Sequence, residues 1–412
     1  MKIVNIKAIE ILDSRGNPTL RTFITLDNGV VACSSVPSGV STGSHEAVEL
    51  RDNDIKRYGG LGVLKAVNNV NSLIKNSLIN QEADPKKIDE TIIALDGTEN
   101  KSRLGANAIL SVSQALIKAA ALSKKLPLWQ FINEYYFNGE KPLMPKMMFN
   151  VVNGGKHANW NFDIQEFIII PSRQLVSQSI KMASEIYHSI KKTLKEKKLS
   201  TLVGDEGGFS PALKSNEEAF QLIIDSAKQV GYENGKDFKL GIDGAASEFF
   251  QAGKYILKKD SQEITGDELI KYYLQIENKY GVYSFEDVFA EDDWENWTKF
   301  KIQLDPNKLL VGDDLFCTNT KRMKTGQEKQ AANAVIIKPN QIGTIYETVE
   351  AIKLAKQYGW AVAVSHRSGE TEDSFIADLA YAASADFLKT GAPCRSDRTT
   401  KYNRLIEIEN SY

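Results

Sequence analysis

The stretch AVIIKPNQ, residues 334–341, indicates how the second half of the chain folds. Four apolar residues predict a buried strand, and this strand gives way abruptly to a lysine, Lys338. Because a proline disfavours helical backbone at the residue before it, we expect Lys338 to be the last strand residue. Ionisable side chains at strand ends are typical of the carboxyl face of a (β/α) barrel, where active sites form.

The same arrangement recurs along the second half of the sequence. Polar or ionisable residues follow apolar segments at three more positions: Asp313 after residues 309–311, SHRS (365–368) after residues 361–364, and Lys389 after residues 387–388. Helical patterns separate these segments, which predicts an α/β barrel. Earlier strands are expected over residues 147–152 and 164–171, consecutively, and near residues 202, 240 and 283.

Length and pattern together predict two domains. At 412 residues, the chain exceeds the roughly 150 residues typical of one domain. Residues 3–37 predict a strand meander with a hairpin turn at DNG (27–29), and residues 62–136 predict helices. We therefore expect an N-terminal α+β capping domain over residues 1–138 and a (β/α) barrel catalytic domain over residues 139–412.

Composition gives no reason to expect a nucleic acid or a membrane as a partner. Lys and Arg number 51 against 53 Asp and Glu, for a net charge of −2. No apolar stretch reaches the length of about 18 residues that a transmembrane segment needs, and the beginning of the sequence predicts no signal peptide. The three cysteines lack the C-x-x-C spacing of a zinc or redox site. These features predict a soluble cytoplasmic protein.

Three carboxylates close predicted strands: Asp243, Glu286 and Asp313. Oxygen ligands converging from successive strands suit a hard cation such as Mg²⁺ rather than zinc. Each residue taken alone is equally well explained as the cap of a following helix. Three of them at successive strand ends, with Lys338 on the next strand, favour a metal site.

Cationic residues accompany these carboxylates. Lys338 beside a divalent cation would have its ammonium form disfavoured, which lowers its pKa towards that of a general base. His366, Arg367 and Lys389 add positive charge that matches a small anionic substrate, and the guanidinium of Arg367 suits phosphate oxygens.

Other segments leave two interpretations open. The loop VGDEGGF (203–209) gives Glu206 room to approach a substrate, although such a loop is often only a turn. His157, in NGGKHA (153–158), is equally ambiguous. The loop PSGVSTG (37–43), which contains Ser41, is either a helix-capping loop or a mobile lid over the barrel mouth.

Motifs spanning the chain resemble those of the enolase family, whose members dehydrate 2-phosphoglycerate to phosphoenolpyruvate. They are, in chain order, DSRGNP (13–18), PSGVSTG (37–43), LDGTENKSRLGANAIL (95–110), NGGKHA (153–158), QEF (165–167), GDEGGF (204–209), SEF (247–249), ED (286–287), GDDLF (312–316), IKPNQIG (337–343), SHRSGETED (365–373), KTG (389–391) and RSDR (395–398).

The resemblance implies a role for each matching residue. It implies a first Mg²⁺ held by Asp243, Glu286 and Asp313, and a second that joins with the substrate at Ser41. It implies that Lys338 takes the C2 proton and that Glu206, assisted by Glu166, protonates the leaving C3 hydroxyl. The remaining implied site residues bind the substrate or line its pocket: Arg367 and Ser368 at the phosphate, Lys389 on the carboxylate side, Gln165 elsewhere on the substrate, and His157 and His366 in the pocket lining.

The implied fold is a ββαα(βα)6 barrel behind an N-terminal antiparallel meander with helices, usually assembled as a homodimer or larger oligomer. The sequence departs from the commonest family pattern at Gly244 and Val288, and it ends at Tyr412 without the longer tail of many relatives. None of these departures removes a catalytic group. They bear on the backbone near the metal and on any role of the tail.

Two other functions remain compatible with the residues. An enolase-superfamily dehydratase acting on a phosphonate analogue would keep the metals and the base but change the contacts on the phosphate side. A non-catalytic binding protein would not need every site residue. The presence of Arg367, Ser368 and the loop 37–43 favours an enolase over both.

Overall fold

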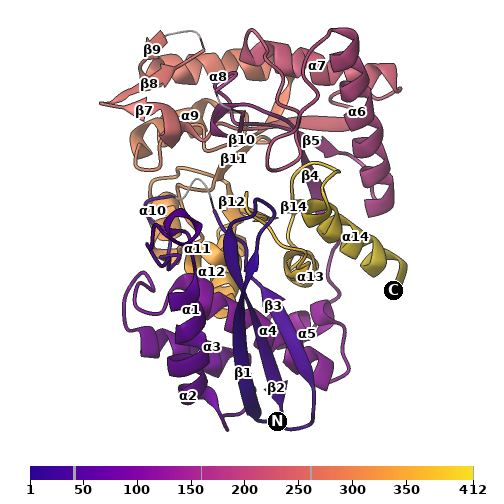
Figure 1. The fold of residues 1–412 in the computed structure, drawn as a ribbon. Helices are drawn as coiled ribbons and strands as arrows, with labels where there is room; N and C mark the ends of the chain where they lie inside the picture. Colours follow the sequence, from indigo (N-terminus) through magenta and orange to yellow (C-terminus); the bar gives the residue numbers. More distant parts are fainter. Residues whose placement is uncertain (40–42, 159, 260–261, 412) are drawn as a thin grey trace.

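The computed structural model describes residues 1–412 apart from 40–42, 159, 260–261 and 412. Figure 1 shows the N-terminal part of the chain, coloured indigo to purple, at one end of the molecule and a barrel of strands at the other.

Three antiparallel strands open the chain in the order β1-β2-β3: Ile3–Leu12, Pro18–Leu26 and Val31–Ser35. Both connecting turns follow from their sequences. Asp13 accepts backbone hydrogen bonds from Arg15 and Asn17 at 2.8 Å, which closes the first turn. Gly29 supplies the left-handed backbone, with φ of +83°, that the second turn requires. The predicted meander is confirmed.

Helices follow the meander, as the sequence predicts. The main ones are α3 (Pro85–Asp96), α4 (Ala106–Ser123) and α5 (Leu128–Tyr136), preceded by the short elements η1 (Tyr58–Gly60), α1 (Leu64–Asn69), η2 (Val70–Ile74) and α2 (Lys75–Leu78). Helix α3 has both of its ends specified by sequence. The side chain of Asp84 caps its first turn by accepting from the backbone N–H of Lys87, and Gly97 ends it with a left-handed φ of 68°.

Helix α4 is the central helix of the N-terminal part. Its small residues allow close packing on the sheet, with Ser111 Oγ 2.7 Å from Thr22 Oγ1 and Ser34 donating to Gln114 at 2.9 Å. Among the described residues, it is the one helix whose length and mean hydropathy would suit a membrane span, although Asn107, Gln114 and Lys118 interrupt its apolar sequence. Of that stretch, 83% is buried inside the protein. Its apolar character is therefore that of a core helix.

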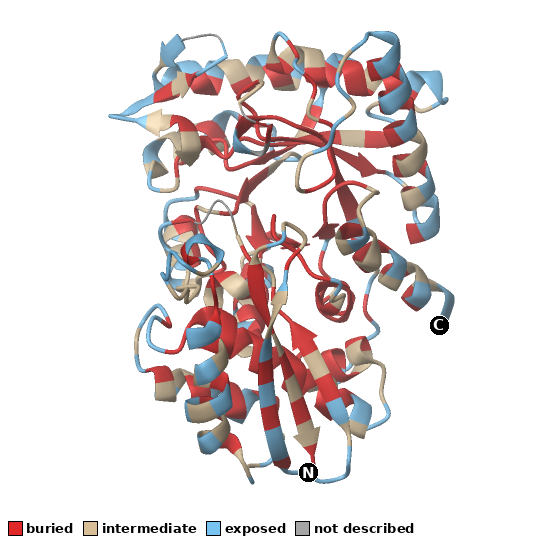
Figure 2. Cartoon of the chain, viewed as in Figure 1, coloured by how far each residue is buried: buried red, intermediate tan, exposed pale blue. Residues whose placement is uncertain are grey.

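Eight strands close a barrel in the order β10-β11-β12-β13-β14-β4-β5-β6. Their bounds are β4 Lys146–Asn153, β5 Glu166–Pro171, β6 Phe238–Asp243, β10 Val282–Glu286, β11 Leu309–Gly312, β12 Ala334–Ile337, β13 Ala361–Ser365 and β14 Phe387–Lys389. Figure 2 shows burial along most of these strands, with exposed residues concentrated on the outer helices.

Helices connect the strands and cover the outside of the barrel. They are α6 (Val176–Glu196), α7 (Asn216–Gln229), α8 (Gly266–Tyr280), α9 (Trp294–Gln303), α10 (Thr320–Glu328), α12 (Ile345–Gln357), α13 (Phe375–Ala382) and α14 (Ser396–Ser411). Shorter elements are η3 (Gly155–Ala158), η4 (Ala246–Phe249), α11 (Pro339–Ile342) and a small sheet of β7 (Phe250–Gln251), β8 (Lys254–Leu257) and β9 (Gln262–Ile264).

Strand β5 runs antiparallel to both of its neighbours, whereas the other neighbouring pairs in the barrel are parallel. Strands β4 and β5 are joined without a crossover helix, which an antiparallel pair allows and a parallel pair does not. The two helices α6 and α7 then separate β5 from β6. This is the ββαα(βα)6 order that the resemblance implies, and the adjacent first two barrel strands agree with the prediction from the sequence pattern.

The prediction of a strand near residue 202 is wrong. Residues 202–209 contribute only isolated bridges, in which Phe209 pairs with Val152 and Val203. Leu202 is 77% exposed and Val203 38% exposed, so this short apolar pair has no buried face to form a strand on. The barrel closes without it, and the segment serves instead as the loop that holds Glu206.

A buried carboxyl group joins the two parts of the molecule. Asp89, in α3, accepts hydrogen bonds at Oδ2 from Ser113 in α4 at 2.8 Å and from the backbone N–H of Tyr346 in α12 at 3.0 Å. No hydrogen bond reaches its Oδ1 within the described part of the chain. Burial raises the pKa of Asp89 to about 7. The hydrogen bonds from the Tyr346 backbone and from Ser113 favour the ionised form and oppose this shift.

We predict that Asp89→Asn stabilises the protein at about pH 8. The folded pKa lies above the unfolded value of about 3.9, so Asp89 favours folding less and less as pH rises between about 4 and 7. The neutral amide avoids that loss, which raises the free energy of unfolding at pH 8 by about 2 kcal/mol. Thermal unfolding across this pH range measures the effect. Glu90→Gln, on the exposed face of α3, is the control, and an equal stability change at pH 5 and pH 8 would contradict the assignment.

Candidate active site

Strand alternation determines which side chains enter the barrel mouth. Apolar residues fill the interior: Met148, Ile168, Ile170, Val311, Ala334, Ile336, Ala363 and Phe387. Side chains two residues apart on a strand share a face, so on the parallel strands the residue two positions beyond the last interior residue points into the mouth. Lys338, Asp313 and Lys389 follow Ile336, Val311 and Phe387 in this way. Glu166 precedes Ile168 because β5 runs in the opposite direction.

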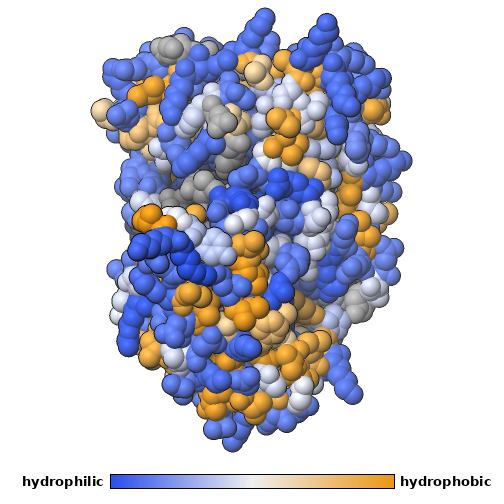
Figure 3. Space-filling view, in the orientation of Figure 1, coloured by the Kyte–Doolittle hydropathy of each residue, from blue (hydrophilic) through white to orange (hydrophobic). Residues whose placement is uncertain are grey.

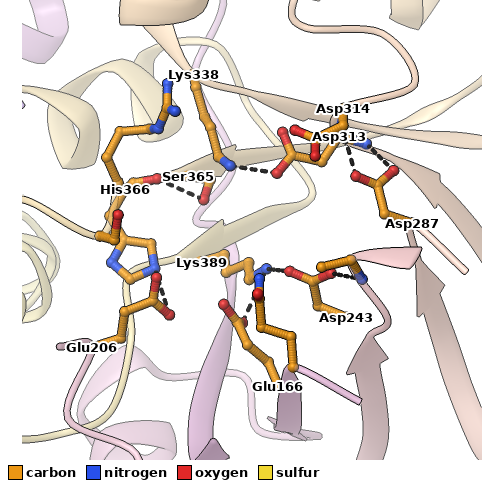
Figure 4. Close-up of a pocket in the computed structure, with 14 residues that line it drawn as sticks. Glu166, Glu206, Asp243, Asp287, Asp313, Asp314, Lys338, Ser365, His366 and Lys389 are labelled. Carbon is orange, nitrogen blue, oxygen red and sulfur yellow. Dashed lines mark hydrogen bonds and ion pairs between the residues drawn. The ribbon is translucent and has the colours of Figure 1, made fainter. Parts of the chain in front are cut away.

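These side chains line one pocket at the carboxyl ends of the parallel strands (Figure 4). The structure brings together in its lining the following residues of the predicted set: Gln165, Glu166, Glu206, Asp243, Asp313, Lys338, His366, Arg367, Ser368 and Lys389. Glu286 does not line this pocket itself, but its carboxylate accepts a hydrogen bond from Lys389, which does.

Three acidic residues stand in a row across neighbouring strands. Asp243 is the register partner of Glu166 on β5 and of Glu286 on β10. Directly opposed like charges destabilise a sheet, and burial adds a desolvation cost. Lys389 offsets both the repulsion and the desolvation cost. Its Nζ lies 3.1 Å from Glu166, 3.3 Å from Asp243 and 2.7 Å from Glu286. These carboxylates hold the pKa of Lys389 well above its ordinary value, although burial alone would lower it.

Asp313 and Lys338 form a second ion pair beside this row. Lys338 Nζ contacts Asp313 Oδ2, and Gln341 donates to Asp313 Oδ1 at 3.0 Å. Burial would raise the pKa of Asp313, but Lys338 holds it below its ordinary value. Conversely, Asp313 raises the pKa of Lys338 against the effect of burial. In this arrangement Lys338 is therefore a protonated ammonium group.

The carboxylates fit a divalent cation. Glu286 Oε2 is buried and accepts no hydrogen bond within the described residues, so one coordinating oxygen is available. Asp243, Glu286 and Asp313 end or directly follow β6, β10 and β11, which are neighbours in the barrel. The donor set consists of oxygens alone, which suits Mg²⁺. Burial raises the pKa of Glu286 well above its ordinary value, as expected where the compensating charge is incomplete.

Asp287 supports this site from the next position along the chain. Its two oxygens accept the backbone N–H groups of Asp313 at 2.9 Å and Asp314 at 2.7 Å. It thus orients the end of β11 and the carboxylate that follows. Carboxylate oxygens of Asp287, Asp313 and Asp314 lie within 4.8 Å of one another, which makes this group a second candidate set of cation ligands.

A carboxyl pair occupies another side of the pocket. The side chains of Glu166 and Glu206 share a hydrogen bond, and Asn150 donates to Glu206 Oε2 at 3.1 Å. Burial and the nearby charge of Glu206 raise the pKa of Glu166 well above its ordinary value. Two buried carboxyl groups in contact hold one proton between them, because both cannot ionise at low cost. The pair is therefore equipped to donate a proton.

Arg367 already holds an anion from the N-terminal part of the chain. Its Nη1 and Nη2 lie 2.8 and 3.1 Å from the two oxygens of Glu46, and Nη1 also donates to Asn340 at 3.0 Å. The carboxylate therefore occupies the paired N–H groups of a guanidinium, whose geometry also suits phosphate oxygens. Glu46 is tied in turn to the backbone N–H of Gly43 at 3.1 Å.

Two predicted residues are not placed. Ser41 and the centre of the proposed lid lie outside the described residues, and so does the side chain of His157. The unusual Gly244 is accommodated closely, because a side chain there would come within 3.0 Å of the carbonyl oxygen of Asp287 and 3.2 Å of Tyr273 Oη. Its backbone N–H donates to the carbonyl of Glu286 at 2.8 Å, which ties β6 to β10 beyond the strand end.

Several residues that shape the site were not found by sequence reasoning: Glu46, Asn150, Asp287, Asp314, Gln341 and Arg398. Asp287 and Asp314 offered a local signal, since each directly follows a predicted metal ligand. The others act through contacts between distant segments, which no local pattern reveals.

The architecture and the acidic barrel mouth define a class of enzyme, the enolase superfamily, whose members bind Mg²⁺ and act on small molecules. Residues 3–132 match the family described as enolase, N-terminal domain, and residues 141–412 match the family described as enolase, C-terminal TIM barrel domain. The chain therefore belongs to the enolase family.

The pairing of Arg367 with Glu46 leads to a binding prediction. A phosphate that enters the pocket has to displace the Glu46 carboxylate from the guanidinium. Glu46→Gln should therefore tighten the binding of inorganic phosphate by about three- to tenfold. Calorimetric titration measures this. Glu291→Gln is the control, because Glu291 accepts from the Oγ of Ser44, which lies in the same loop as Glu46, at 2.6 Å, whereas the guanidinium of Arg367 donates to Glu46. Weaker phosphate binding would mean that Glu46 orients Arg367 rather than competing for it.

Proposed function

We propose that this protein is a phosphopyruvate hydratase, a hydro-lyase that reversibly converts 2-phospho-D-glycerate to phosphoenolpyruvate in glycolysis and gluconeogenesis. The observation that supports it most is the separation of Lys338 from the Glu166 and Glu206 pair across one pocket (Figure 4). A β-elimination that removes a proton from one carbon and a hydroxyl from the next needs a base and an acid placed apart.

Arg367 and Ser368 bind the substrate phosphate. The paired N–H groups of the buried guanidinium favour phosphate over a single-point anion. Lys389 binds on the side of the substrate carboxylate, Gln165 also binds the substrate, and His366 lines the pocket. A role for His157 at the substrate rests on the family resemblance alone, since its side chain lies outside the described residues.

Lys338 removes the proton from C2, and the electrons of that C–H bond form the C2–C3 double bond. Glu206, which shares a proton with Glu166, protonates the hydroxyl that leaves C3, so that one water is released. After each turnover Lys338 releases the proton it took to solvent and Glu206 takes a proton up from solvent, which restores the starting state.

Asp243, Glu286 and Asp313 would hold one Mg²⁺, and Ser41 together with the substrate phosphate a second. Bound there, Mg²⁺ supplies positive charge that stabilises the extra negative charge on the substrate carboxylate when C2 is deprotonated. Compensation of the Asp313 charge would also release Lys338 from its ion pair and lower its pKa towards that of a base.

We further propose a cytoplasmic homodimer or higher homo-oligomer, with residues 1–138 as the capping domain and 139–412 as the catalytic domain. Support for association comes from exposed apolar side chains on the N-terminal sheet, including Val4 (44% exposed), Leu12 (55%) and Val31 (55%). Figure 3 shows apolar side chains gathered over the N-terminal half of this face.

The roles of base and acid are separable by hydrogen exchange. With Mg²⁺ and 2-phosphoglycerate in D₂O, Lys338→Ala should abolish both dehydration and exchange of the C2 hydrogen. Glu206→Gln should reduce dehydration by at least about a hundredfold yet leave C2 exchange measurable, because the base remains. Proton NMR of the C2 position reports exchange, and phosphorus NMR reports product.

Exchange that persists in Lys338→Ala and disappears in Glu206→Gln would reverse the two assignments. Wild-type protein that converts a phosphonate analogue in preference to 2-phosphoglycerate would identify the alternative dehydratase. If the wild-type protein neither exchanges the C2 hydrogen nor dehydrates either compound, the alternative of a non-catalytic binding role would be favoured.

A further inference from the structure

Arg398, in the first turn of α14, reaches two of the loops that form the site. Its side chain is fully buried, and Nη1 lies 2.5 Å from Nδ1 of His366. Nη2 donates to the backbone carbonyl of Asp205 at 3.1 Å and to that of Ser368 at 2.6 Å. One guanidinium therefore connects the residue before Glu206 with the segment that holds His366 and Ser368.

This contact determines where the proton on His366 is. A guanidinium has N–H donors and no acceptor, so the ring nitrogen that faces it has to be the acceptor. Nδ1 of His366 is therefore unprotonated, and the neutral imidazole has its proton on Nε2. Nε2 lies 3.7 Å from Oε2 of Glu206, so the N–H edge of the ring faces the proposed acid.

The surroundings oppose protonation of the ring. The charged groups that face it are Glu206, Arg398, Lys389 and Lys338, from four different segments. Burial lowers the pKa of His366 well below its ordinary value; Glu206 opposes this shift, and the three cations reinforce it. A second proton would also have to displace Arg398 from Nδ1.

Close packing restricts rotation of the His366 ring. Gly391 lies where the three groups meet, with φ of +78°. A side chain there would come within 3.2 Å of His366 Cε1, 3.1 Å of Arg398 Cδ and 2.6 Å of the carbonyl oxygen of Glu206. Close packing on this side holds the imidazole between Arg398 and Glu206.

We propose that Arg398 is a positioning residue that fixes His366 in the Nε2–H tautomer and so keeps the transferable proton of the site on the Glu166–Glu206 pair. Without Arg398, His366 could carry its proton on Nδ1 and present the lone pair of Nε2 to Glu206, and the proton of Glu206 would then move to the ring. The consequence for turnover rests on the proposed function, whereas the tautomer of His366 does not.

Histidine-selective ¹⁵N NMR tests the proposal, because the chain has only 4 histidines. The signals of His366 are assigned by their loss in His366→Gln. In the wild type, His366 should show the Nε2–H pattern and no titration between about pH 6 and 8. In Arg398→Met, His366 should titrate within that range. Arg398→Lys should restore the Nε2–H pattern, since an ammonium group is also only a donor.

Activity supplies a second readout. In Arg398→Met, kcat should fall about tenfold further at pH 6 than at pH 8, as His366 becomes protonated on the acid side. Arg395→Met is the matched control: Arg395 lies three residues earlier, its side chain is 31% exposed, and it donates to the backbone of Ser14 rather than to His366. It should leave the His366 spectrum and the pH profile unchanged.

Either of two results would overturn the proposal. One is a wild-type His366 that titrates near pH 7 or has its proton on Nδ1, a result that needs neither a variant nor substrate turnover. The other is an Arg398→Met protein that loses activity equally at every pH with an unchanged His366 spectrum, as a purely structural role would require. Because the wild-type spectrum decides the tautomer, the proposal can be tested even if Arg398→Met fails to fold, or if 2-phosphoglycerate is not the substrate.

Discussion

The ion pairs of Lys389 with Glu166, Asp243 and Glu286 are the interaction on which the barrel mouth depends. Three carboxylates in register on β5, β6 and β10 repel one another, and each has lost hydration. A cation at the end of β14 crosses the barrel and meets all three. Breaking a buried arrangement of this kind by removing one partner typically costs about 3–5 kcal/mol, because it leaves unpaired charges inside.

This arrangement also explains how one site holds a base, an acid and cation ligands together. The lysines supply part of the positive charge that these carboxylates need, and where the compensation is incomplete the pKa of the carboxyl group rises. Glu286 has an oxygen without a hydrogen bond among the described residues. Burial and the charge of Glu206 raise the pKa of Glu166 well above its ordinary value. The protonation state of each group is thus set by its neighbours rather than by its residue type.

Local sequence patterns predicted the parts of this structure that depend on local physics. Apolar strands, turn residues and helix caps act within a few positions, so the meander, the barrel and the residues at the strand ends could be read from the sequence. The strand near residue 202 failed because apolar residues alone do not make a strand without a surface to bury them. Arg398 and His366 are 32 residues apart and Glu46 and Arg367 are 321 apart, so their contacts arise only from the fold.

We propose that these compensated charges form a magnesium-dependent centre for the dehydration of 2-phosphoglycerate. The most direct measurement is the formation of phosphoenolpyruvate by the wild-type protein, followed by ultraviolet absorbance with Mg²⁺ and again after treatment with a chelator. We expect turnover with Mg²⁺, its loss on chelation and its recovery when Mg²⁺ is restored. Full turnover in the chelated protein would contradict the role of Asp243, Glu286 and Asp313, and no turnover under any of these conditions would contradict the function itself.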